Sequence, residues 1–280
     1  MRIKNYLLLI LIIISSIIVS IVAIYFKDNV YSAYYSSITT TPMEALPFKA
    51  MAQGVYPWTK PETNQEEKVD LETIKGNKTT IKEFTTVDDS YFDDALFIGD
   101  SRMLGLSQYC QALSSRATFY AEKSLTIYDI KNTEWIDDGD GNKVSLAKAI
   151  EGKHFSKIYI MVGINEIGTG DVESFKDAYA KVVYGLMYLQ PDATIFINSI
   201  MHVSQEKDTT DELYNNTNIN ERNEALKEIA DNSRIFYLDI NEAVDDENGN
   251  LKAETTGDGV HLKAAYYEPW HQYLLSHGVE

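Results

Sequence analysis

Short apolar runs rich in β-branched and aromatic residues alternate with segments of helical periodicity along the C-terminal part of this chain. The runs cover residues 95–98, 118–121, 157–162, 194–198 and 235–238. Such alternation is typical of a parallel sheet with helices on both faces, because parallel strands have to be joined by crossover connections. The sequence therefore predicts an α/β fold in which a five-stranded parallel sheet forms the middle of three layers.

Three segments show the clearest helical periodicity, and they cover residues 172–189, 218–232 and 263–276. Asp171 or Ser174 is a suitable N-cap for the first, because its side-chain oxygen can accept a hydrogen bond from a free N–H group there. Pro269 lies inside the third segment. Since proline has no N–H group and its ring clashes with the preceding turn, we expect that helix to be kinked or split.

Residues 6–26 form an unbroken run without a charged side chain, and Arg2 and Lys4 precede it. As a helix, this run would be about 31 Å long, which matches the hydrocarbon thickness of a bilayer. A cleaved signal peptide has a shorter apolar core and a small-residue cleavage site, and neither is clear here. We expect an uncleaved single-pass anchor in the cell membrane, with residues 1–5 in the cytoplasm and all later residues outside.

Residues 27–85 hold four of the six prolines, a run of three threonines and a polar stretch. We interpret them as an extracytoplasmic stalk. Residues 86–280 are long enough for one domain with a substantial core. The single cysteine, Cys110, excludes an internal disulfide, so this core has to stabilise the domain by itself.

The formal net charge of −17 argues against a nucleic-acid partner, since binding to phosphates needs clustered lysines and arginines. Two glycine-containing acidic stretches, residues 137–142 and 245–250, lack the spacing of a calcium-binding loop. Asp-Gly and Asn-Gly sequences readily adopt positive φ, which favours turns between short strands in both places. The sequence predicts neither a metal ion nor another cofactor.

Ser101 follows the expected strand 95–98 and precedes a helical stretch, so its hydroxyl should lie at the carboxyl edge of the sheet. Open α/β sheets bind ligands at that edge, and a helix N-terminus offers free N–H groups to a negative oxygen. A serine hydroxyl is a weak nucleophile at neutral pH, and it needs an imidazole that a carboxylate orients. Gly-Asp-Ser by itself is also a common sequence for a strand-to-helix turn.

Asp258 and His261 lie three residues apart in a glycine-containing loop before the last helix, where both side chains can turn toward Ser101. Together these three residues are candidates for a nucleophile, its base and an orienting carboxylate. His202 follows the expected strand 194–198 and also reaches the carboxyl edge, which makes it a candidate for substrate contact.

Asn165 directly follows the expected strand 157–162 and adds a third polar group at the same edge. Its amide can donate a hydrogen bond to an oxyanion, and such a donor stabilises a transition state by roughly 3 to 4 kcal/mol when it is pre-positioned. The alternative is a turn asparagine that bonds to its own backbone.

Three blocks, residues 97–101, 163–166 and 258–261, stand in the order in which their counterparts occur in a known family. Through the sequences Phe-Ile-Gly-Asp-Ser, Gly-Ile-Asn-Glu and Asp-Gly-Val-His, the chain resembles the SGNH, or GDSL-type, serine hydrolase superfamily in its membrane-anchored bacterial form. The resemblance extends from about residue 97 to the last helix. It implies a three-layer α/β/α, flavodoxin-like domain.

The resemblance also implies roles for individual residues. Ser101 would attack an ester carbonyl, His261 would remove and return the proton, and Asp258 would orient His261. The oxyanion would be held by the backbone N–H of Ser101, the side chain of Asn165 and a third donor. In the family that third donor is a glycine after the second strand, and here Ser124 takes its place in the sequence.

Two further residues are candidates for substrate binding. Glu166 stands where the family more often has aspartate, and we expect it to affect hydrogen bonds of its loop rather than the chemistry. Arg102 follows the nucleophile, and the sequence leaves open whether it binds an anionic group or is merely solvated.

Three functions fit these observations. The first is a membrane-tethered serine esterase that removes acetyl or another short acyl group, with an ester-bearing small molecule or a cell-wall or surface carbohydrate as substrate. The second is an O-acyltransferase that passes the same acyl group to a sugar hydroxyl, with a neighbouring membrane protein as acyl donor. The third is a non-catalytic carbohydrate-binding or scaffold domain, because a fold does not establish activity.

Overall fold

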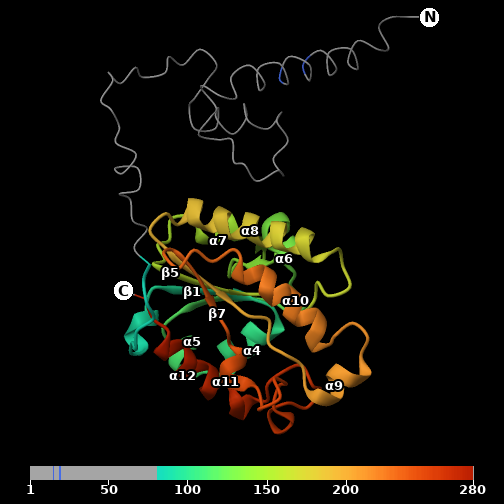
Figure 1. Cartoon of the computed structure of the whole chain (residues 1–280). Coiled ribbons are helices and arrows are strands. Elements are labelled where there is room, and N and C mark those ends of the chain that lie inside the picture. The colour runs from blue at the N-terminus through green and yellow to red at the C-terminus, as the bar shows by residue number, and fades with distance from the viewer. Residues whose placement is uncertain (1–14, 16–18, 20–80, 280) are drawn as a thin grey trace, which may run out of the picture. The chain divides into compact units, whose positions relative to one another are not determined.

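The computed structural model describes Ser15, Val19 and residues 81–279 (Figure 1). The predicted cytoplasmic end, membrane anchor and most of the stalk therefore lie outside the described residues. Within the described part, no helix combines the length and the hydropathy that a membrane span requires. The anchor and the extracytoplasmic location stay predictions.

The last residues that the sequence assigns to the stalk are hydrogen bonded to the domain. The N–H of Lys82 donates to the carbonyl of Asn232 at 3.0 Å. Thr85 and Gly278 exchange two backbone hydrogen bonds, of 2.8 and 2.9 Å, in an antiparallel bridge. The folded domain thus begins before residue 86, because these backbone groups find partners near the C-terminus.

The central sheet has five parallel strands in the order β2-β1-β5-β6-β7, which confirms the predicted sheet. The strands are β1 (Ala95–Gly99), β2 (Thr118–Ala121), β5 (Lys157–Met161), β6 (Thr194–Asn198) and β7 (Ile235–Leu238). Each predicted strand is present, with ends that differ by no more than one residue. Sequence reasoning succeeded here because β1, β5, β6 and β7 are mostly buried and read as continuous apolar runs, while β2 at the edge is half-buried.

Helices cover both faces of the sheet, as Figure 1 shows. One core contains Leu96 and Ile98 of β1, and the other contains Phe97, because successive side chains of a strand point to opposite faces. The first face packs against α6 (Ile127–Asn132), α7 (Leu146–Ile150), α8 (Val172–Leu189) and α10 (Asn216–Lys227). The second packs against α4 (Ser101–Tyr109), α5 (Gln111–Ser114), α11 (Asn241–Val244) and α12 (Glu268–Ser276).

The long helices agree with the expected ones except at some ends. Helix α8 spans the predicted residues, and the side chain of Asp171 caps it by accepting the N–H of Ser174. Helix α10 ends at Lys227, five residues before the predicted end at residue 232. The C-terminal segment is split into a 3₁₀ turn, Ala264–Tyr266, and α12, with Pro269 in the first turn of α12, where its missing N–H is tolerated.

Both acidic glycine-containing stretches form turns. A short hairpin, β3 (Ile136–Asp137) and β4 (Lys143–Val144), encloses the first stretch, and its two glycines have φ of 87° and 89°. The second stretch lies between Asp245 and Leu251, which form an isolated bridge. The remaining short elements are the helix α9 (Gln205–Thr210) and the 3₁₀ turns Asp89–Phe92 and Ala253–Thr255.

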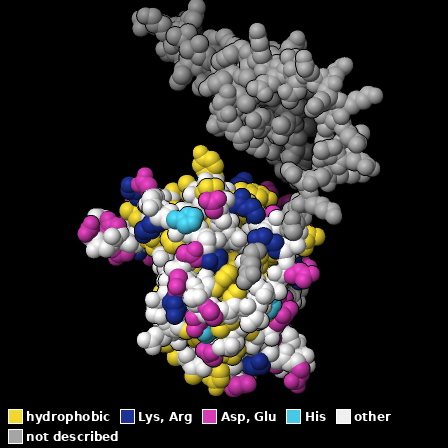
Figure 2. Space-filling view, turned by 90° about the vertical axis from the view of Figure 1, so that its left-hand side faces the viewer, with side chains coloured by type: hydrophobic (Ala, Val, Ile, Leu, Met, Phe, Trp, Pro, Cys, Tyr) yellow, Lys and Arg dark blue, Asp and Glu magenta, His cyan; other side chains and the backbone are white. Residues whose placement is uncertain are grey.

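The described surface carries acidic and basic side chains that are interspersed rather than separated, as Figure 2 shows for one face. Hydrophobic side chains lie between them in small patches. Acidic side chains nevertheless outnumber basic ones in the whole sequence, 42 to 25.

Candidate active site

Ser101 is the first residue of α4 and lies two residues after the end of β1, an interior strand with neighbours on both sides. Asp100 caps the helix, and its Oδ1 accepts the N–H of Arg102 at 2.9 Å. Gly99 lets the helix start close to the sheet. A Cβ there would lie only 2.5 Å from the carbonyl oxygen of Met161. The turn therefore holds the Ser101 hydroxyl at the carboxyl edge.

Three side chains form a continuous hydrogen-bonded chain at this edge. The Ser101 Oγ lies 2.8 Å from Nε2 of His261, and Nδ1 of the same ring lies 2.7 Å from Oδ2 of Asp258. With the carboxylate on Nδ1, that nitrogen carries a proton and Nε2 is free to accept the serine proton. The arrangement is that of a nucleophile, a base and an orienting group.

The loop that carries this base is fixed by its own hydrogen bonds. Oδ1 of Asp258 accepts the backbone N–H groups of Val260 and His261 at 2.9 and 2.8 Å. Burial raises the pKa of Asp258, but these N–H groups and the His261 ring outweigh it, and they hold that pKa well below its usual range. Asp258 is therefore ionised at neutral pH.

Gly259 allows the close packing of this loop, since it has φ of 79° and a Cβ there would lie 2.7 Å from Ser204 Oγ.

A hollow of about 400 Å³ opens in front of Ser101. Such a volume is within the usual range for ligand sites, roughly 300 to 1,000 Å³. Burial raises the pKa of Tyr267 in its wall to about 12, so this phenol stays protonated at neutral pH. The lining residues are Ser101, Leu104, Gly105, Gln108, Tyr109, Lys123, Ser124, His261, Leu262 and Tyr267.

Most of the folded domain matches a known protein family. The sequence model of the GDSL-like Lipase/Acylhydrolase family matches residues 97–268. The chain belongs to this family. As a GDSL-like acylhydrolase it is an enzyme that hydrolyses esters.

Solved structures resemble this acylhydrolase in fold. A protein from Streptococcus pneumonia, provisionally described as a platelet activating factor, is 22% identical with a TM-score of 0.51, over 65% of this chain and 81% of its own. A GDSL-like lipase from Bacteroides thetaiotaomicron is 14% identical with a TM-score of 0.49, over 65% of this chain and 85% of its own. No curated protein matches the sequence.

Ser124 and Asn165, the candidate oxyanion donors of this GDSL-like enzyme, belong to two neighbouring loops. Ser124 lines the same hollow as Ser101 and has φ of 61°, the left-handed conformation that glycine adopts most easily. Ser124 therefore holds a backbone conformation that glycine would adopt with less strain. The amide of Asn165 donates to the carbonyl of Leu125 at 3.1 Å, which orients it and leaves a second N–H.

Glu166 is buried and has no surface that a substrate could contact. Its side chain is fully buried, and Oε1 accepts the N–H of Ile127, the first residue of α6, at 2.5 Å. Burial raises the pKa of Glu166 to about 7. The substrate-binding prediction for Glu166 therefore conflicts with its position, whereas the expected effect on loop hydrogen bonds fits. Asn165 and Glu166 together hold residues 125–127, directly after Ser124.

Arg102 is neither solvated nor free to bind an anionic substrate. Its side chain is 1% exposed, and its guanidinium donates to the carbonyls of Met201 and Val260 at 2.9 and 3.2 Å. Because Val260 precedes His261, this contact ties the first turn of α4 to the loop that carries the base. The burial of Arg102 therefore contradicts both alternatives that the sequence left open, a solvated side chain and one that binds an anionic group.

His202 is held away from Ser101 by partners of its own. Nδ1 lies 2.5 Å from Oδ2 of Asp245, and Nε2 lies 2.8 Å from Oδ1 of Asn220. Burial lowers the pKa of His202, but hydrogen bonds to these two residues and the charge of Asp245 outweigh it, so the net pKa is raised. The substrate contact predicted for His202 conflicts with this arrangement, because both ring nitrogens are occupied.

Several residues of the hollow were not found from the sequence. Tyr109 and Tyr267 form part of its wall, with ring centroids 5.6 Å apart. One signal was available, since glycine inside a helix often marks close packing. A Cβ on Gly105 would lie 1.8 Å from the hydroxyl of Tyr267.

Within the described residues, no group of three His, Cys, Asp or Glu side chains is arranged to hold a metal ion.

Proposed function

We propose that this acylhydrolase is a serine esterase that removes acetyl or another short acyl group from a carbohydrate ester. The observation that carries the proposal is the chain of hydrogen bonds from Ser101 through His261 to Asp258, with distances of 2.8 and 2.7 Å. The family membership supplies the reaction class, and this geometry supplies the residues that would perform it.

In the first half-reaction, the Ser101 Oγ would attack the ester carbonyl carbon while Nε2 of His261 takes the hydroxyl proton. The tetrahedral intermediate then collapses, the bond to the alcohol oxygen breaks, and the imidazolium returns its proton to that oxygen. The sugar leaves as an alcohol and the acyl group stays on Ser101. The ionised Asp258 stabilises the imidazolium that exists between these two transfers.

The negative oxygen of the intermediate would be held by the N–H groups of Ser101 and Ser124 and by the free amide N–H of Asn165. The start of α4 adds the positive end of its helix dipole. Removal of one such donor costs about 3 to 4 kcal/mol of transition-state stabilisation in well-studied hydrolases.

In the second half-reaction, water would replace the alcohol and release the acid. The side chains of His261 and Asp258 are 43% and 57% exposed, so water reaches the base directly. This exposure favours hydrolysis over transfer to a sugar, because a transferase has to exclude water from its acyl-enzyme.

The substrate and the location are the further parts of the proposal. The wall of the hollow combines the aromatic rings of Tyr109 and Tyr267 with the polar side chains of Gln108 and Lys123, which suits a sugar better than a long hydrocarbon. The uncharged run 6–26 after two basic residues supports a membrane anchor with the domain outside the cell.

The test of the chemistry is hydrolysis of p-nitrophenyl acetate by the full-length protein and by Ser101→Ala. We expect at least about 10³-fold lower kcat/KM for the variant with unchanged folding. Ser107→Ala is the matched control, since it removes a hydroxyl from the same helix that donates only to the carbonyl of Leu104. Equal turnover by the wild type and Ser101→Ala would reject the proposal.

The location has a separate test. The intact protein should be found in the membrane fraction of lysed cells. Protease added to intact cells should degrade its domain. Protection of the domain until the cells are lysed would contradict the extracytoplasmic placement.

A further inference from the structure

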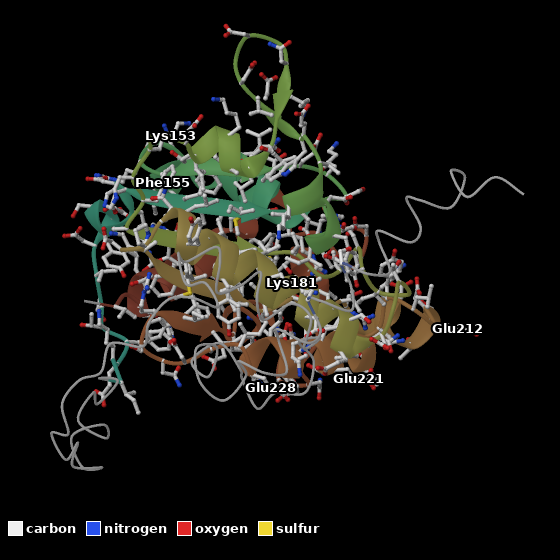
Figure 3. The ribbon with its side chains drawn as sticks, turned by 90° about the horizontal axis from the view of Figure 1, so that it is seen from above. Lys153, Phe155, Lys181, Glu212, Glu221 and Glu228 are labelled. Carbon is white, nitrogen blue, oxygen red and sulfur yellow. The ribbon has the colours of Figure 1, made fainter. Side chains whose placement is uncertain are left out.

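A second hollow adjoins the one that holds Ser101. It has a volume of about 450 Å³ and lies between the strand β2 and the β3–β4 hairpin. Leu104 and Lys123 line both hollows, so the two lie next to each other. Strand β2 is at the edge of the sheet, with β1 as its neighbour, so part of its backbone faces outward. Figure 3 shows the hairpin projecting from the domain at the top of the view.

The walls of this second hollow combine apolar rings with charged groups. Phe119 and Tyr120 of β2 are half-buried, and both line the hollow. On the opposite side, Nζ of Lys143 donates to the carbonyl of Trp135 at 2.6 Å and lies 3.3 Å from the carboxylate of Glu122. Lys143 and Glu122 remain 51% and 43% exposed, so both can also bind a ligand.

This combination discriminates between ligand classes. A hydrocarbon chain placed here would desolvate the charges of Glu122 and Lys143 without giving them new partners, which is costly. A sugar ring has an apolar C–H face that can pack on Phe119 or Tyr120, and hydroxyl groups that hydrogen-bond to a carboxylate and an ammonium. The lining therefore favours a carbohydrate.

The position of the hollow decides which part of a substrate it would hold. A short acyl group is small enough for the hollow of about 400 Å³ beside Ser101. The part of an ester that extends further is the alcohol, which here is a sugar chain. Lys143 of the hairpin also pairs with Glu122, two residues before Ser124, so the second hollow lies next to the loop of a proposed oxyanion donor.

We propose that the cleft between β2 and the β3–β4 hairpin is a subsite for the sugar units that neighbour the acylated one, on the alcohol side of the ester. This subsite rests on the proposed esterase function. It makes an O-acylated oligosaccharide, rather than a single acylated sugar, the preferred substrate class.

The test measures kcat/KM of the full-length protein for p-nitrophenyl acetate and for O-acetylated cello-oligosaccharides of one, three and five glucose units. We expect KM to fall at least about tenfold from one to three units, with little change in kcat. Lys143→Ala should remove most of this length dependence. Lys131→Ala, an exposed lysine of α6 that lines neither hollow, is the matched control.

A second variant fills the hollow instead of removing a contact. Asp137→Trp places a large ring into it from an exposed position on β3, whereas Asp140→Trp puts the same ring at the exposed hairpin tip. We expect the first variant to abolish the length dependence and the second to retain it. If the wild type hydrolyses all oligosaccharides with one KM, or if both variants retain the length dependence, the subsite is rejected while the esterase function stands. Loss of all ester hydrolysis in the wild type would instead reject the proposed function.

Discussion

Two histidine–aspartate pairs lie at the carboxyl edge of the sheet, and their surroundings differ. In the first pair, His261 and Asp258 are 43% and 57% exposed. In the second, His202 and Asp245 are 12% and 9% exposed. Each pair joins Nδ1 of the ring to a carboxylate oxygen, at 2.7 and 2.5 Å. The pairing by itself therefore does not identify a catalytic base.

The difference lies at the other ring nitrogen. Nε2 of His261 faces the hydroxyl of Ser101, whereas Nε2 of His202 faces the side-chain oxygen of Asn220. An amide oxygen has no proton to give, so His202 is held between two acceptors and its protonated form is stabilised. The first pair is thus arranged to move a proton, and the second to fix a loop.

Substitution of the two histidines should separate these roles most strongly. His261→Ala should lower kcat/KM for p-nitrophenyl acetate at least about 10³-fold, because the members of a triad act as a unit. His202→Ala should change kcat/KM less than about threefold and lower the melting temperature. Comparable losses of activity in the two variants would show that the second pair also serves the chemistry.

The two aspartates give a smaller contrast. Asp258→Asn should lower kcat/KM strongly but less than His261→Ala does, since an asparagine oxygen can still accept the N–H groups of Val260 and His261. Asp245→Asn should leave kcat/KM nearly unchanged and reduce stability. The kinetics are measured with p-nitrophenyl acetate and the stability by urea unfolding. A stable, inactive Asp245→Asn protein would overturn this division.

Glu166→Gln tests the buried contact between Glu166 and Ile127, three residues after Ser124. The pKa of Glu166 is about 7 in the folded protein and 4.5 in the unfolded chain. The unfolded chain therefore releases this proton first, and the fold loses stability as the pH rises from about 4.5 to 7. The neutral glutamine should remove that loss, so the variant should gain stability relative to the wild type above about pH 7 and not at about pH 4. Urea unfolding at both pH values measures the difference. Parallel stability curves would contradict the burial argument.

The smallest effect concerns the pH dependence of the second pair. The raised pKa of His202 means that its contribution to stability is present below its unfolded value of 6.5 and is lost as the pH rises through the folded value. His202→Gln should therefore lose more stability at about pH 5.5 than at about pH 9. His154→Gln is the control, as an exposed histidine. An equal loss for His202→Gln at both pH values would show that packing, rather than charge, is what the side chain provides.

The sequence predicted the strands and the three residues that the structure brings together, because both depend on local patterns. Buried strands are apolar runs, and Ser101, Asp258 and His261 stand in short motifs at strand and helix ends. The surroundings of Arg102 and Glu166 were not predictable in this way. Arg102 is buried where carbonyls from two distant loops converge on it, and a single sequence does not show such convergence.

The cleft beside β2 was missed for a related reason. The turn between the short strands β3 and β4 was predicted from its Asp-Gly sequences. Its position beside an edge strand depends on tertiary contacts, among them the burial of Trp135 and Ile136 in a core. Local propensity predicts that a hairpin forms, and packing determines what it covers.

Labelling with a fluorophosphonate tests the central claim most directly, because this reagent reacts with a serine hydroxyl only when a neighbouring base activates it. Mass spectrometry of the full-length protein should show one adduct, on Ser101, and labelling of His261→Ala should be strongly reduced while His202→Ala is labelled like the wild type. An unlabelled wild type, an adduct on another residue, or equal labelling of His261→Ala would contradict the assignment of Ser101 and His261 as nucleophile and base.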